Sequence, residues 1–438
     1  MLPATHSLHF RVHTRVLVTL LLVLAVLAVT ALGEPLHRAL VREAGDALKS
    51  GDHATALAKL EAARALRPDY PRVLLNLARG HAAANRPADA LGHLQTLAGM
   101  GLAVDIAADP ALAALRDQPG FAGLVDAFAA NARLRAGAAD EAAWAATDVT
   151  GILESVAIHP ETLESFFGDV RNRCIWYRDV SGPHAVLKKF SAEADALDAV
   201  FAVKVDPARH TLWASCSALP EMAGYAEADR GRAALVAYDL RSRQLRRRHE
   251  LPADGQPHVL GDFAIAPDGT VYATDSAAPV VWRLAPGATR PEPWLRHDDF
   301  ASLQGITISA DGGTLHVADY ANGLWRIDAA SGAAALLPAP AGSTLFGIDG
   351  LYAVAGGLVA VQNGINPQRV LRIDLDDAGR PARARVLFAG HPAMTDAALG
   401  QVVNGRLHFI ADAGWSLFGQ PGANPAPRTV TILTTATE

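Results

Sequence analysis

After residue 150 the chain contains six segments with a similar order of β-forming runs and turns. The first residue of each segment can therefore be compared with the first residues of the other five. The segments begin at Glu154, Phe201, Gly261, Gln304, Asp349 and Asp396. Three of these side chains are carboxylates and a fourth is an amide. Oxygen ligands of this kind suit calcium, magnesium, manganese or, less often, zinc. If the six places converge, the carboxylates raise one another's pKa unless a cation lies between them. The alternative is that each side chain only caps a strand or bonds to backbone.

The spacing of the segments predicts the fold that would bring them together. Successive starts are 47, 60, 43, 45 and 47 residues apart, and short β-forming runs alternate with turns such as Pro267-Asp268-Gly269. A unit of about 45 residues is typical of a propeller blade, whose innermost strand starts near the central channel. We therefore expect an all-β, six-bladed propeller over 149–425 and a C-terminal tail over 426–438. The long second interval predicts an insertion near 221–232.

The residues before the predicted propeller differ from it in composition and in the spacing of their apolar side chains. Residues 36–130 are rich in alanine and leucine at helical spacing, and the similar octets 50–57 and 84–91 place Ala56 and Ala90 34 residues apart. This is the period of tetratricopeptide repeats, which the two units resemble, and a third helix pair starting at Asp109 has the look of a cap. The module could present a surface to a partner protein or act as a spacer. Residues 131–148 are expected to be a linker. The module's histidines are expected to be solvated: His53, His81 and His93.

The N-terminus predicts export. Arg11, His13 and Arg15 precede a largely apolar run of 17 residues, 16–32, without a charged side chain. That length is near the lower limit for a spanning helix and above a usual signal h-region, so residues 1–33 are either a signal peptide or a membrane anchor. The expected location is the bacterial periplasm, in free form or anchored to the inner membrane and facing the periplasm.

Composition excludes some classes and leaves one question open. The net charge of −6 offers no electrostatic reason for a nucleic-acid partner. Cys174 and Cys216 could form one disulfide or remain two thiols. The sequence shows no glycine-rich phosphate loop, no nucleophile elbow and no Cys or His cluster with zinc-site spacing.

Three short motifs carry a resemblance to a known family. They are Glu154-Ser155-Val156, Gln304-Gly305-Ile306 and Asp349-Gly350-Leu351. With them, residues 151–419 resemble the senescence marker protein and gluconolactonase family of the paraoxonase-like superfamily. The resemblance implies a lactonase or esterase with a small-molecule substrate and one divalent ion, held by Glu154, Gln304 and Asp349. It also implies that Asp349 is the candidate base and that Asp262 is a further ligand or a water-orienting group.

Departures from the family pattern narrow this expectation. Gln304 stands where the family has asparagine, Gly261 replaces another asparagine, and Val259 replaces a substrate-binding arginine. These differences argue against gluconolactone itself and favour another lactone or ester, or a propeller whose activity has lapsed. From its repeat position, Asp396 is expected to be an additional metal ligand.

The sequence-based hypothesis is a metal-dependent hydrolase of lactones or esters, with calcium as the first choice of ion and zinc, magnesium or manganese as alternatives. The rival hypothesis is a non-catalytic scaffold in the cell envelope that binds partner proteins. Among the histidines of the propeller, His258 and His391 precede inner strands and are the candidates for a base at the channel mouth.

Overall fold

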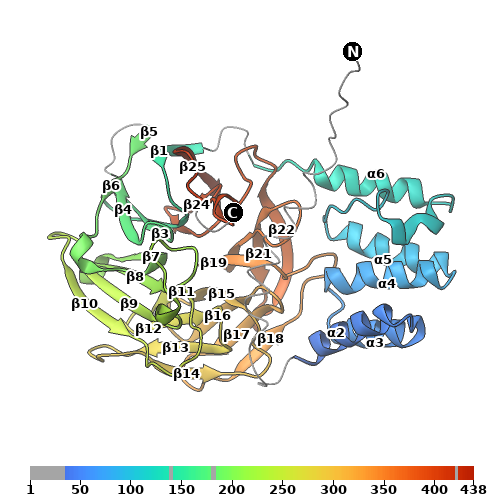
Figure 1. Ribbon diagram of the computed structural model, residues 1–438, viewed down its shortest axis with the longest axis horizontal. Coiled ribbons are helices and arrows are strands. Elements are labelled where there is room, and N and C mark those ends of the chain that lie inside the picture. The colour runs from blue at the N-terminus through green and yellow to red at the C-terminus, as the bar shows by residue number, and fades with distance from the viewer. Residues whose placement is uncertain (1–34, 138–141, 179–183, 420–422) are drawn as a thin grey trace, which may run out of the picture.

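Six mainly antiparallel sheets, one of which contains a parallel strand pair, follow one another around a ring, which confirms the predicted six-bladed propeller (Figure 1). The computed structural model describes residues 35–137, 142–178, 184–419 and 423–438. Blade 1 consists of β2 (Leu153–Ile158), β3 (Ser165–Asp169), β4 (Cys174–Arg178) and β6 (Lys188–Lys189). Blade 2 consists of β7 (Ala199–Asp206), β8 (Thr211–Ser217), β9 (Ala233–Asp239) and β10 (Leu245–Glu250). Blade 3 consists of β11 (Leu260–Ile265), β12 (Val271–Asp275), β13 (Val280–Leu284) and β14 (Glu292–Arg296). Blade 4 consists of β15 (Leu303–Ile308), β16 (Thr314–Asp319), β17 (Gly323–Asp328) and β18 (Ala334–Leu337). Blade 5 consists of β19 (Ile348–Val354), β20 (Gly357–Gln362), β21 (Arg369–Leu375) and β22 (Pro381–Ala389).

The sixth blade closes the ring by joining both ends of the propeller sequence. Its strands are β23 (Gly400–Val403), β24 (Arg406–Ile410), β25 (Arg428–Ala436), β1 (Ala142–Val149) and β5 (His184–Val186). The expected linker over 131–148 and tail over 426–438 were therefore wrong where they include β1 and β25. These strands pair antiparallel, with Ala145 opposite Thr431. The alanine-rich composition of β1 hid a strand whose partner lies at the other end of the chain.

The insertion predicted near 221–232 is confirmed. The connection between β8 and β9 spans residues 218–232 and contains the short helix η5 (Glu227–Asp229). Because it follows the second strand of its blade, it lies at the end of the propeller where the inner strands begin.

The N-terminal module consists of antiparallel helices, as its 34-residue period predicts. Its elements are α2 (Leu36–Lys49), α3 (His53–Leu66), α4 (Pro71–Ala83), α5 (Pro87–Gly99), the 3₁₀ helix η2 (Pro110–Leu115) and α6 (Phe121–Ala132). Asp52 caps α3 by accepting a hydrogen bond from Thr55 N, and proline opens α4 and α5, where its missing N–H is tolerated. Ala56 and Ala90 have no exposed surface, which confirms that the repeated small residues lie where helices touch.

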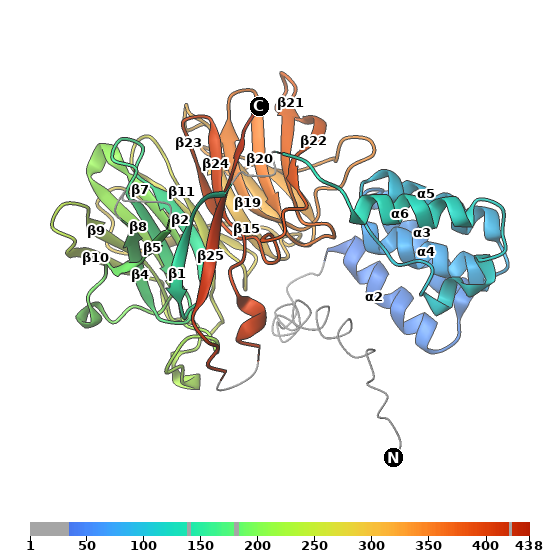
Figure 2. The ribbon, with the colours of Figure 1, turned by 90° about the horizontal axis from the view of Figure 1, so that it is seen from above.

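The helical module packs against blades 4 and 5 of the propeller (Figure 2). Tyr70 stacks on Phe346 with ring centroids 4.3 Å apart, and the guanidinium of Arg67 lies over the same ring and donates to the carbonyl of Asn322. In the opposite direction, Arg369 Nη1 of β21 donates to Met100 O at 3.0 Å. The two parts therefore share a buried, hydrogen-bonded contact.

Large aromatic side chains fill the spaces between blades, as expected. Trp282 and Trp325 are each only 2% exposed. The indole N–H of Trp282 donates to Asp275, which ends the second strand of blade 3, and Trp176 donates in the same way to Asp169 in blade 1. A repeated pair of tryptophan and aspartate thus links neighbouring strands within a blade.

The two cysteines are separate, buried thiols on β4 and β8, so no disulfide joins them. Burial raises the pKa of Cys174 and raises that of Cys216 to about 12. Both thiols are therefore protonated and unreactive at neutral pH.

Within the described residues, no helix combines the length and apolar character needed to cross a membrane. The apolar run 16–32, on which the prediction of an export signal or anchor depends, lies outside the described residues.

Candidate active site in the propeller channel

The predicted site positions coincide with irregularities in the inner strands. In five blades the pairing of the innermost strand shifts register at the predicted place. The shifts lie between Leu153 and Ser155, Val200 and Val203, Leu260 and Phe263, Leu303 and Ile306, and Ile348 and Gly350. A bulge takes a residue out of the ladder and redirects its side chain. A β-bulge of this kind therefore redirects the side chains of Glu154, Gln304 and Asp349.

Glu154 and Asp349 form the electrostatic centre of the channel. They come from opposite parts of the sequence, yet each is less than 10% exposed and each lies within the field of other carboxylates. Burial and then the charge of Asp349 raise the pKa of Glu154 well above its usual value. Burial, with the charges of Asp262 and Asp396, raises the pKa of Asp349 from 3.8 to about 7. Neighbouring carboxylates thus raise the pKa of Glu154 and of Asp349, as expected from the sequence.

Two residues that sequence reasoning missed contact these carboxylates. Asn363, which follows β20, donates from Nδ2 to Asp349 Oδ2 at 2.8 Å and to Ala397 O at 2.7 Å. Its Oδ1 is buried and has no hydrogen-bond partner among the described residues. Trp415, in the short helix η6 (Trp415–Leu417), donates its indole N–H to Glu154 Oε2. Both residues follow second strands, so the repeat phase of the inner strands could not reveal them.

Gln304 occupies space that Gly261 leaves open. Its Oε1 accepts a hydrogen bond from Ser276 Oγ at 3.2 Å, and its Nε2 donates to Ser302 Oγ at 3.3 Å. A Cβ atom on Gly261 would lie 3.2 Å from Gln304 Oε1 and 2.5 Å from Ser276 Oγ. The long glutamine at 304 and the missing side chain at 261 are therefore complementary, which gives both residues one physical explanation.

The glycine that follows Gln304 is required by the close approach of two inner strands. A Cβ atom on Gly305 would lie 2.4 Å from Asp349 O, a backbone atom that cannot move aside easily. The strands β15 and β19 thus place Gln304 and Asp349 on the inner strands of neighbouring blades.

Asp396 and Asp262 have additional partners. Asp396 lies four residues before β23, and its Oδ2 accepts hydrogen bonds from Gly414 N at 3.2 Å and Trp415 N at 3.0 Å. Its carboxylate thereby holds the turn that carries Trp415. Asp262 pairs with Lys204 Nζ at 2.8 Å and accepts from Ile306 N at 3.1 Å. Both charges contribute to the raised pKa of Asp349, although both carboxylates are already engaged.

The two propeller histidines singled out from the sequence have partners away from the carboxylates at the channel centre. His258 is 2% exposed and lies between Asp275, at 2.6 Å, and Asp254, at 3.0 Å. Burial opposes its charge, but these two carboxylates outweigh burial and raise its pKa. His391 Nδ1 accepts a hydrogen bond from Ala393 N. Each histidine thus stabilises a local turn or loop.

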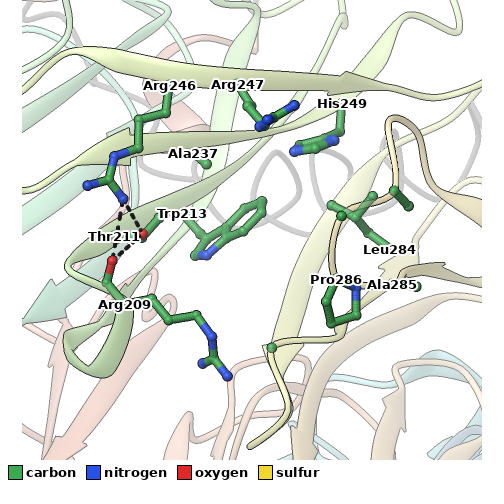
Figure 3. A pocket seen from close by; sticks show the side chains of 13 residues that line it. Arg209, Thr211, Trp213, Ala237, Arg246, Arg247, His249, Leu284, Ala285 and Pro286 are labelled. Atoms are coloured by element: carbon green, nitrogen blue, oxygen red, sulfur yellow. Dashed lines mark hydrogen bonds between the residues drawn. The ribbon is translucent and has the colours of Figure 1, made fainter.

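A separate hollow of about 300 Å³ lies between blades 2 and 3 (Figure 3). Arg246 donates there to Thr211 Oγ1 and pairs with Asp239, while Trp213 stacks on His249. None of the residues lining it, all in the described part of the chain, is a carboxylate. The hollow therefore offers no carboxylate base and no ligand set for a hard cation.

Comparison with known proteins supports the architecture. Residues 47–118 match the tetratricopeptide repeat family, which confirms the helical-repeat prediction. A search of curated proteins finds no significant match.

Solved structures resemble this chain at low identity. An aldose sugar dehydrogenase from Streptomyces coelicolor has 12% identity and a TM-score of 0.43, covering 66% of this chain and 96% of its own. A gluconolactonase from Xanthomonas campestris has 17% identity and a TM-score of 0.42, covering 65% and 88%. A virginiamycin B lyase from Staphylococcus aureus has 13% identity and a TM-score of 0.43, covering 64% and 80%. These likenesses do not identify an activity for this chain.

Proposed function

We propose that the propeller is a metal-dependent hydrolase of lactones or esters, with its active site at the channel carboxylates. The observation that carries the proposal is the meeting of buried Glu154 and Asp349, whose pKa values are both raised. Such perturbation is typical of functional sites because carboxylates are brought together there against their mutual repulsion. The resemblance of their motifs to the senescence marker protein and gluconolactonase family supports the same class.

The side chains around the two carboxylates offer oxygen donors of the kind that a divalent cation takes. Among the described residues, the channel carboxylates do not form a group of three with ligand atoms all within 4.8 Å of one another, so a bound ion would draw them together. Glu154 and Asp349 supply carboxylate oxygens, Gln304 supplies an amide oxygen, and the buried, unpartnered Oδ1 of Asn363 lies beside Asp349. All are hard oxygen donors, which favours calcium over zinc. Asp396 adds negative charge and, since its Oδ2 is engaged, is a secondary ligand in this proposal. When bound, the ion would polarise the ester carbonyl.

The protein's own groups would perform the proton transfer. Without an ion, burial and the charges of Asp262 and Asp396 raise the pKa of Asp349 to about 7. A bound cation would lower this pKa again, so that Asp349 would be ionised at neutral pH and able to accept a proton. Asn363 orients Asp349 through its Nδ2 bond, and Asp262 sustains the raised pKa by its charge while Lys204 and Ile306 N hold it in place. Asp349 would accept the proton of the attacking water, and Trp415 would fix Glu154.

The test is hydrolysis of lactones and aryl esters by the purified full chain, with and without chelator and added calcium. Asp349→Asn should lower kcat/KM by at least about 100-fold, the usual contribution of a general base. Asp377→Asn, an exposed position in the same blade, is the matched control and should leave turnover unchanged. Chelator-insensitive hydrolysis, or full activity in Asp349→Asn, would contradict the proposal.

One observation favours the scaffold as a second candidate. A groove of about 700 Å³ runs between α5 and α6 and is lined by small and apolar residues, including Ala88, Leu91, Gly92, Gly123 and Ala127. Tetratricopeptide helices often bind partner segments in such grooves. Gly92→Lys should fill the groove without a backbone clash, because a Cβ atom there meets nothing within 4 Å. Loss of a partner in Gly92→Lys, with retention in the equally open control Gly45→Lys, would support this candidate.

A further inference from the structure

Three side chains that are far apart in the sequence converge inside the helical module. Glu61 lies on α3, His81 on α4 and His93 on α5, and one potential ligand atom from each lies within 4.8 Å of the other two. His81 is 4% exposed, and the side chain of His93 is 12% exposed. The expectation that these two histidines are solvated was therefore wrong, because the contacts between successive helices bury them.

The distances within this cluster are long for hydrogen bonds. His81 Nε2 lies 3.5 Å from Glu61 Oε1, and His93 Nε2 lies 3.7 Å from the same oxygen. Good hydrogen bonds of this type have separations of about 2.9 Å. Zinc bonds of about 2.0–2.1 Å to nitrogen and oxygen, in tetrahedral geometry, place neighbouring ligand atoms about 3.4 Å apart. The two separations from Glu61 Oε1 are close to the edge length of such a tetrahedron, and the remaining nitrogen–nitrogen separation is within 4.8 Å.

The surroundings orient the three groups toward a common point. The imidazole rings of His81 and His93 are stacked with centroids 5.2 Å apart, so that both present Nε2 to Glu61. Arg64 Nε donates to Glu61 Oε2 at 2.9 Å, which leaves Oε1 for the histidines. This arrangement has the form of an outer-shell contact that orients a metal-ligating carboxylate.

A second, independent observation concerns the other nitrogen of His81. Nδ1 is buried and makes no hydrogen bond within the described part of the chain, and Asp89 Oδ2 lies 3.9 Å away. A metal-ligating histidine almost always donates its remaining N–H to a carboxylate, a carbonyl or water. At 3.9 Å, Asp89 Oδ2 is beyond hydrogen-bond distance, and a shift of about 1 Å would let it accept from Nδ1 when an ion holds the imidazole.

We propose that Glu61, His81 and His93 form a binding site for a divalent transition-metal ion of the zinc class. Two imidazoles and one carboxylate leave a fourth position for water. The bound ion would join α3, α4 and α5, and so link the two tetratricopeptide units through their helices. This site is separate from the oxygen-rich channel of the propeller and is independent of the function proposed above.

The test is titration of chelator-treated full chain with zinc chloride, read by calorimetry and by metal content after dialysis. His93→Phe keeps an aromatic ring beside His81 but removes the ligand nitrogen. Loss of an outer-shell partner already costs about 10- to 100-fold in affinity, so His93→Phe should weaken zinc binding by at least about 100-fold. His53→Phe, at an exposed position on α3, is the matched control and should bind like the original chain. Glu61→Gln should behave like His93→Phe.

Two further measurements keep the proposal open to contradiction. Cobalt bound to the original chain should show the strong visible absorption of tetrahedral coordination, and His93→Phe should lack it. The double variant Glu154→Gln/Asp349→Asn should retain this zinc site, which separates it from any ion in the channel. Equal zinc stoichiometry and affinity in the original chain and His93→Phe would overturn the proposal.

Discussion

At the scale of single residues, the carboxylates of the channel lie close together. Few of their hydrogen-bonded partners carry a positive charge that would offset the repulsion between them. Lys204 pairs with Asp262, while Glu154 and Asp349 are held by neutral donors, Trp415 and Asn363. Neutral donors orient carboxylates but only partly offset their repulsion. This is the physical reason to expect a cation there.

The pKa of Asp349 predicts how metal-free protein responds to pH. Its folded-state pKa is raised from 3.8 to about 7, so its favourable contribution is complete below about pH 4 and is lost as pH rises through 7. Chelator-treated protein should therefore lose stability from pH 4 to 8 by a few kcal/mol at this site, and calcium should restore it most at pH 8. Thermal denaturation across this range checks the effect. Asp349→Asn should flatten the response, and an unchanged slope in that variant would contradict the assignment.

At the scale of elements, blades 1, 3 and 4 depend on hydrogen bonds made by the aspartate that ends the second strand, which is Asp169, Asp275 or Asp319. Asp275 has no exposed surface and accepts from Val259 N, Ala277 N and Ala278 N, as well as from the indole of Trp282. Asp319 accepts backbone hydrogen bonds in the same way in blade 4. These aspartates hold the turns at the channel end of the blades, and so position the inner strands.

Replacing Asp275 should therefore be costly. Asp275→Ala leaves several buried donors without an acceptor, and each such donor costs about 1–3 kcal/mol, so the total loss should be at least about 3 kcal/mol. Denaturant unfolding measures this loss. The exposed control Asp377→Ala should change stability by less than about 0.5 kcal/mol. Similar values for the two variants would show that the capping network does not stabilise the blade.

At the scale of the whole molecule, the helical module and the propeller are joined through buried polar groups. His37 on α2 is 6% exposed, and its Nε2 lies 2.8 Å from Asn322 Oδ1 in blade 4. Burial and the charge of Arg67 lower the pKa of His37 from 6.5 to about 4. The contact thus requires a neutral imidazole.

Acidification should weaken this contact. Because the folded-state pKa of His37 is lowered, its contribution to stability is complete above pH 6.5 and is lost as pH falls from 6.5 to 4. Hydrogen exchange of the helical module should accelerate over that range. His37→Gln keeps a hydrogen-bond donor without a titrating group, and should show a smaller pH response. Equal responses in both proteins would exclude His37 as the cause.

Closure of the ring makes the propeller dependent on its C-terminal strand. Removal of 428–438 deletes β25, the strand that lies between β24 and β1 in blade 6. The truncated chain should lack cooperative thermal unfolding, because two strands lose their pairing partner and the ring is left open. Removal of Glu438 alone, beyond the strand, is the control. A cooperative transition in the truncated chain would show that closure is dispensable.

The number of blades, the helical repeats and the inner-strand positions of Glu154, Gln304 and Asp349 could be predicted from the amino-acid sequence, because they follow from local periodicity. The place of β1 in blade 6 and the contacts of Asn363 and Trp415 with the carboxylates became known from the folded chain. Folding also brought Glu61, His81 and His93 together from three helices. The reason is physical: a repeat shows which residues are equivalent, whereas pairing between distant strands and side-chain contacts across helices have no local signature in the sequence.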